Sequence, residues 1–193
     1  METFKISRLE AFVDGVFAIA ITLLVLELDL PKLEGGNLAE LIRADLPKFN
    51  SWLVSFFAVG TLWLHHHYAV TQLRAADVVV VILNLILLLF ISVTPWTTSL
   101  IGAYPDQPIA NVLFSGSLGL AWLSIALISM YARHNDLLRP EAPQHAPGFV
   151  TSLISLRGTI IAVVSIALTY LGVSWAVLIW LLLFAIHPFI FKR

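Results

Sequence analysis

The chain has 193 residues, of which 59% are hydrophobic and only 12% are charged, with a formal net charge of −1 and no cysteine. Soluble domains carry about twice that share of charged residues, so composition predicts a polytopic membrane protein whose partner is the lipid bilayer. The balanced charge argues against nucleic acid as a partner, and the absence of thiols excludes disulfides and cysteine-ligated metals.

Six segments are apolar enough to cross a bilayer core, for which a helix needs about 20 residues. They cover residues 6–30, 49–73, 77–101, 108–132, 149–171 and 173–191. We therefore predict an all-α fold that forms one transmembrane domain over residues 1–193, with six transmembrane helices per subunit.

Positively charged side chains gather on one side of these segments. If the N-terminus is cytoplasmic, that side receives Lys5, Arg8, Arg74, Arg133, Arg139, Lys192 and Arg193, and the other side keeps Lys32, Arg43 and Lys48. Because Lys and Arg favour cytoplasmic loops, we predict a multi-pass protein of the cell membrane with both termini in the cytoplasm. Arg157, early in the fifth segment, is expected to extend toward the same side.

The first segment begins with three charged residues inside RLEAFVDGVFAIAITLLVLEL, residues 8–28. At about 100° per residue, one stripe of this helix carries Arg8, Phe12, Gly15, Ile19, Thr22 and Leu26, with Leu23 at its border. Asp14 lies about 120° from Arg8, on a face turned toward neighbouring helices. A buried carboxylate needs a partner or a proton, so Asp14 is either a packing contact or a functional group. Spacing alone leaves both interpretations open.

The second segment contains WLHHHYAV, residues 63–70. Neighbouring residues on a helix diverge by about 100°, so His65, His66 and His67 cannot converge on one ion as the histidines of H-E-x-x-H do. We therefore predict no metal site. Trp63 and His67, four residues apart, share a face and are able to act together.

The third and fourth segments carry features of helix packing. Asn84 lies inside an apolar run, where a single amide commonly joins two helices. Pro95 predicts a kink whose freed carbonyl groups are capped by Thr94, Thr97 and Thr98. In the fourth segment, the small residues Ser115, Gly116 and Gly119 favour close contact with another helix.

Several motifs are absent from the sequence. It has no G-x-x-x-x-G-K-[ST] loop, no G-x-S-x-G elbow and no H-E-x-x-H, so we predict that the protein is not an enzyme and takes no cofactor. It also lacks the T-V-G-Y-G stretch that builds a carbonyl filter for potassium.

The stretch of residues 8–28 resembles the signature of the transmembrane protein 175 family, the endolysosomal potassium channels and their prokaryotic relatives. The family pattern is Arg, three residues, Phe-Ser-Asp and then a helix rich in Ala, Ile and Leu. Arg8, Phe12 and Asp14 match this pattern, and Val13 replaces the serine. The resemblance continues in the Trp63 and His67 pair and in the spacing of Asn84 and Pro95.

This resemblance implies a potassium-permeable cation channel, a homotetramer in which helix one of each subunit lines a central pore. It implies a hydrophobic constriction of Ile19, Leu23 and Leu26, a hydroxyl ring of Thr22, and a structural network of Arg8, Phe12, Asp14, Trp63, His67 and Asn84. Glu27 and Asp29 would concentrate cations at the outer mouth, although a solvated helix end explains them equally well.

Two other functions fit the same residues. One is a proton-coupled transporter that works through Asp14 and His67. The other is a non-transporting membrane assembly protein, whose polar groups only specify how the helices pack.

Overall fold

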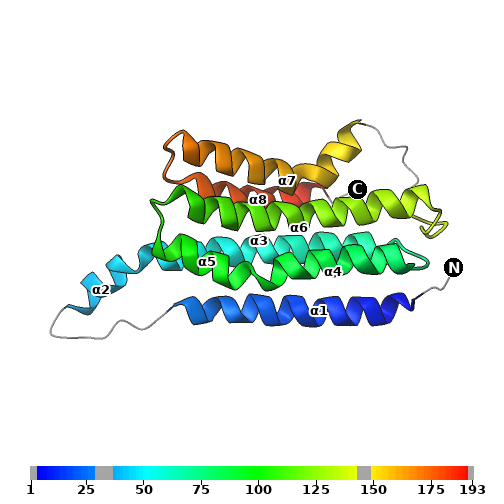
Figure 1. Cartoon of the computed structure of the whole chain (residues 1–193), viewed down its shortest axis with the longest axis horizontal. Helices are drawn as coiled ribbons and strands as arrows, with labels where there is room; N and C mark the ends of the chain where they lie inside the picture. The colour runs from blue at the N-terminus through cyan, green and yellow to red at the C-terminus, as the bar shows by residue number, and fades with distance from the viewer. Residues whose placement is uncertain (1–3, 29–36, 143–148, 191–193) are drawn as a thin grey trace.

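The computed structural model describes residues 4–28, 37–142 and 149–190, which form a bundle of helices lying along one long axis (Figure 1). In chain order the elements are α1 (Ile6–Leu23), the 3-10 helix η1 (Leu24–Glu27), α2 (Leu38–Ala44), α3 (Leu46–Thr71), α4 (Val78–Ser92), α5 (Thr94–Ala103), α6 (Pro108–His134), α7 (Phe149–Tyr170), the 3-10 helix η2 (Ala176–Trp180) and α8 (Leu181–Ile190). Within these ranges β structure is limited to isolated bridges, which confirms the helical fold.

The helix α1 forms one edge of the bundle and packs on α3 and α4, whereas α7 forms the opposite edge and packs on α6 (Figure 1). The helix α8 packs on α3. Fully buried side chains fill the space between the helices, among them Leu62, Leu87, Phe114, Trp122 and Trp180. Because α1 has neighbours on one side only, its other side is left bare.

Three stretches of the described chain are long and apolar enough to cross a membrane: Ile6–Glu27, Val78–Ala103 and Pro108–His134. The stretches Leu156–Tyr170 and Ala176–Ala185 are apolar but shorter. The count of six spans therefore stays a prediction.

The predicted helix over residues 77–101 is divided in two, because α4 ends at Ser92 and α5 begins at Thr94. Proline lacks the N–H that would continue the helical hydrogen bonds, so Pro95 causes the break. The hydroxyl of Thr94 donates to the Phe90 carbonyl at 3.1 Å, and that of Thr98 donates to the Thr94 carbonyl at 2.8 Å. The break in the helix is confirmed, but the Ile91 carbonyl that Pro95 leaves free accepts from the Val93 N–H rather than from a threonine.

Two predicted helix ends are wrong. The segment 6–30 leaves the α-helix at Leu23 and continues as η1 only to Glu27. The segment 173–191 begins with η2 rather than with an α-helix. Before η2, Gly172 with its φ of +80° adopts the left-handed conformation that closes α7.

One end of the bundle is held together by backbone hydrogen bonds to the turn between α3 and α4. The Phe4 N–H donates to the Ala76 carbonyl at 2.8 Å, and the Arg139 N–H donates to the Gln72 carbonyl at 2.8 Å. The first residues of the chain and the segment after α6 thus meet at one turn.

Glycines allow α6 and α7 to approach closely. A Cβ at Gly158 would lie 2.1 Å from Cγ of Trp122, and one at Gly119 would lie 2.5 Å from Cβ of Ala162. Ser115 also faces α7, since its hydroxyl lies 3.1 Å from that of Ser165. The prediction fails for Gly116, where a Cβ would meet nothing within 4 Å.

The substitution Gly158→Ala should destabilise the protein by about 1–3 kcal/mol, because the added methyl overlaps the buried Trp122 ring. The control is Gly116→Ala, which adds the same methyl in open space and removes a flexible residue from a helix. Thermal unfolding in detergent, followed by tryptophan fluorescence, should show a lower midpoint for Gly158→Ala alone. Equal midpoints for the two variants would contradict the close approach.

Candidate functional site

The helix α1 has a buried face and a bare face. The buried face carries Leu9, Val13, Phe17 and Ala20, with Leu24 of η1 continuing it. The bare face carries large apolar side chains with exposed fractions of 54% for Phe12, 61% for Ile19, 42% for Leu23 and 68% for Leu26. The stripe that the helical wheel places on one side of the first helix is therefore the side that no other part of the described subunit covers.

Polar groups interrupt this apolar stripe. The Thr22 hydroxyl donates to the carbonyls of Ala18 and Ile19, both at 2.9 Å, and the side chain stays exposed. Arg8 is exposed at the start of α1, where it lines an open groove together with Lys5 and Phe12. No hydrogen bond or ion pair within the described residues joins Arg8 to Asp14.

Asp14, Trp63 and His67 are brought together between α1 and α3. The indole Nε1 of Trp63 donates to Oδ1 of Asp14 at 2.8 Å. The Trp63 ring stacks on the His67 ring, with the centroids 5.8 Å apart and the planes at 25°. Asp14 stays exposed in the single subunit, beside a groove of about 350 Å³ that is also lined by Ala18 and Gly60.

Asn84 lies apart from this trio and pairs with His66. The amide nitrogen of Asn84 donates to the Val80 carbonyl at 2.8 Å, so its oxygen Oδ1 faces Nε2 of His66, also at 2.8 Å. A carbonyl oxygen only accepts, so Nε2 of His66 carries the proton. Both side chains are almost fully buried, and the His66 ring stacks on Phe17 of α1.

The remaining histidine of the triplet turns the other way. His65 stacks on Trp122 of α6 with the centroids 4.8 Å apart, and its Nδ1 lies 3.3 Å from Nη2 of Arg157. The guanidinium of Arg157 lies 5.0 Å from the centre of the Trp122 ring. An aromatic face and an imidazole thus hold this cation against α6, and the expectation that Arg157 extends toward the cytoplasm stays a prediction.

The three histidines point in different directions, as their angular spacing requires. His67 stacks on Trp63 of its own helix and stays exposed, His66 meets α4 and α1, and His65 meets α6. In the described part of the chain, no three His, Asp or Glu side chains form a possible metal site. Sequence reasoning missed the role of His66, since nothing in the triplet tells which ring points inward. Glu27 is half-buried at the end of η1, and Asp29 lies outside the described residues.

Residues 8–95 match the sequence family described as the endosomal/lysosomal potassium channel TMEM175. A potassium channel of Chamaesiphon minutus is 31% identical over 180 residues, which cover 89% of this chain and 88% of the relative. A potassium channel of Streptomyces collinus is 36% identical over 121 residues, 62% of this chain and 59% of the relative, less than two-thirds of its length.

The human endosomal/lysosomal proton channel TMEM175 is 34% identical over 110 residues, which cover 52% of this chain and 22% of that protein. Among solved structures, a lysosomal potassium-selective channel TMEM175 homolog from Chamaesiphon minutus superposes with a TM-score of 0.81 over 97% of this chain and 98% of that chain. The sequence identity of 23% in that superposition makes it a likeness of fold.

The substitution Asn84→Leu should lower stability by about 1–3 kcal/mol, because it leaves the buried N–H of His66 without an acceptor. The double variant His66→Leu with Asn84→Leu removes both polar partners and should recover part of the loss. Thermal unfolding of wild type, both single variants and the double variant forms the cycle that measures this coupling. Strictly additive effects would show that the two side chains do not interact.

Proposed function

Because the chain belongs to the TMEM175 family, we propose that it is a potassium-permeable cation channel of the cell membrane. In this proposal four subunits assemble around a central pore that is lined by α1 of each. Every subunit crosses the membrane six times, and both termini are cytoplasmic. The names of the bacterial relatives, which are potassium channels, support this choice.

The observation that carries the proposal is the position of Asp14. It lies about 12 Å along α1 from the first residue of the helix, yet it is exposed on the single subunit. A carboxylate at that depth is costly to place against lipid and almost always faces protein or a water-filled path. A second subunit beside α1 would provide the protein surface, and a pore would provide the water. The position of Asp14 therefore favours assembly through the side of the molecule that carries it.

The bare stripe of α1 supplies the proposed constriction. Ile19, Leu23 and Leu26 would each form a ring of apolar side chains around the axis, with the Thr22 hydroxyls between them. Apolar rings cannot replace the water that a cation loses, so they pass ions according to the cost of removing that water. Potassium holds its hydration shell less tightly than sodium and would be favoured.

The side chains that pack between α1 and α3 would hold the exposed apolar stripe of α1 in its orientation toward the pore. The hydrogen bond from Trp63 to Asp14 fixes the rotation of α1 relative to α3, and the contact of His66 with Phe17 supports it from the same helix. We assign Arg8 and Phe12 to the inner end of this network. Glu27 and Asp29 are assigned to the outer mouth, where their charge would attract cations.

If Ile19 forms part of the constriction, Ile19→Asn should wet it, raise total cation flux and lower the preference for potassium over sodium toward unity. The measurement is ion flux into liposomes that contain wild type or variant protein under matched potassium and sodium gradients. The matched control is Leu89→Asn on α4, because Leu89 is as exposed as Ile19, at 62% and 61%. The milder variant Ile19→Thr serves if the asparagine variant does not assemble.

Unchanged permeability ratios in both Ile19 variants would remove this residue from the constriction. Potassium flux that requires a proton gradient would instead favour the transporter that works through Asp14 and His67. The absence of any flux would favour an assembly protein.

The proposed tetramer predicts a particle with four times the 21.4 kDa mass of one chain. Native mass spectrometry from mild detergent measures this directly. One subunit supplies one pore helix, so a closed ring of copies is required. A strictly monomeric protein would exclude the pore described above.

A further inference from the structure

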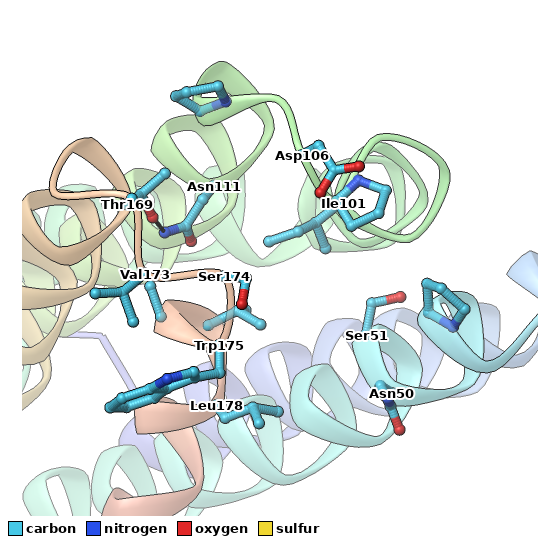
Figure 2. Close-up of a pocket in the computed structure, with 16 residues that line it drawn as sticks. Asn50, Ser51, Ile101, Asp106, Asn111, Thr169, Val173, Ser174, Trp175 and Leu178 are labelled. Carbon is cyan, nitrogen blue, oxygen red and sulfur yellow. Dashed lines mark hydrogen bonds between the residues drawn. The ribbon is translucent and has the colours of Figure 1, made fainter.

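A second concave site, which no residue of α1 or η1 lines, lies at the end of the bundle where α7 turns into η2. It is a cavity of about 400 Å³ with 16 lining residues, which Figure 2 shows as sticks. They come from the start of α3, the end of α5, the α5–α6 connection, the start of α6, the end of α7, the turn after it and η2. We call it the Asp106 pocket. Its volume lies within the range of about 300–1,000 Å³ typical of small-molecule sites.

The walls of this pocket are rigid. Pro47, Pro105 and Pro108 line it, and the ring of each proline fixes one backbone dihedral angle. Gly172 closes α7 at the rim: its N–H donates to the Thr169 carbonyl at 3.0 Å, and the next N–H, of Val173, donates to the Leu168 carbonyl at 3.0 Å. A preformed site loses little conformational entropy when a ligand binds.

The polar groups in the walls divide into two sets. Asn111 already donates to the carbonyl and the hydroxyl of Ser165, at 3.2 and 3.1 Å, and the Ser51 hydroxyl donates to the Lys48 carbonyl at 2.8 Å. Asp106, in contrast, is exposed and forms no hydrogen bond or ion pair with the described residues. Its carboxylate therefore remains available to a ligand.

The charge of the pocket has one sign. Asp106 is the only ionisable residue among the lining residues, and no Lys, Arg or His lies among them. The rest of the surface is largely apolar and includes Ile101, Val173, Trp175 and Leu178. An inorganic cation needs several convergent oxygen ligands, and the pocket offers only one carboxylate.

We propose that the Asp106 pocket binds a small organic ammonium ion. The ammonium group pairs with the Asp106 carboxylate, and the hydrocarbon body of the ligand covers the apolar wall formed by Ile101, Val173 and Leu178. This assignment does not rest on ion conduction, because no residue of α1 or η1 lines the pocket.

The test is calorimetric titration of the purified full-length protein in detergent at fixed ionic strength, with the heat of titration into empty micelles subtracted. The probes are phenethylammonium, the neutral phenethyl alcohol and the anionic phenylacetate, which share an aromatic ring and differ in charge. We expect the ammonium probe to bind to wild type. Its affinity for the Asp106→Asn variant should be roughly tenfold lower, which is the effect of losing a hydrogen bond to a charged group.

The matched control is Asp136→Asn. Asp136 is also exposed, and its φ of 54° is one that asparagine adopts readily, so this variant removes one surface carboxylate away from the pocket. Its affinity for the ammonium probe should equal that of wild type. The proposal is overturned if the ammonium probe does not bind, if the alcohol binds as tightly as the ammonium, or if Asp106→Asn binds like wild type.

Discussion

Inside a bilayer core there is no water to satisfy a polar side chain, so each one must find its partner in protein. Most of this bundle follows that requirement: His66 pairs with Asn84, and Asn111 binds Ser165 on the neighbouring helix. These pairs join α3 to α4 and α6 to α7. The arrangement of the helices is therefore fixed by hydrogen bonds as well as by shape, which matters where lipid supplies no hydrophobic driving force between helices.

The same requirement is met on the inner face of α1 but not on its outer face. Its inner face is satisfied by α3 and α4, and Trp63 donates to Asp14 at the edge of that contact. Its outer face combines exposed apolar residues with Arg8, Thr22 and the open side of Asp14. A surface of this kind suits neither lipid nor bulk water alone. A seam between identical subunits around a hydrated path suits all of its groups.

Much of this arrangement could be predicted from the sequence because it depends on local chemistry. Pro95 has to break a helix, and the period of α1 has to place Ile19 and Leu26 on one side. Which members of the histidine triplet are buried could not be predicted, because the burial of His65 and His66 depends on where Trp122 and Asn84 arrive from other helices. For the same reason the contact of Arg157 with the Trp122 ring could not be predicted.

The hydrogen bond between Phe4 and Ala76 holds the chain at the start of α1. It joins the chain just before Ile6 to the turn between α3 and α4, while at the other end η1 packs on α3 and α5. With a rise of about 1.5 Å per residue, Leu26 lies about 30 Å from Ile6 and Ile19 about 20 Å. If α1 tilted as a rigid body about Ile6, Leu26 would thus move about one and a half times as far as Ile19. A ring formed by Leu26 would then change its width more than a ring formed by Ile19.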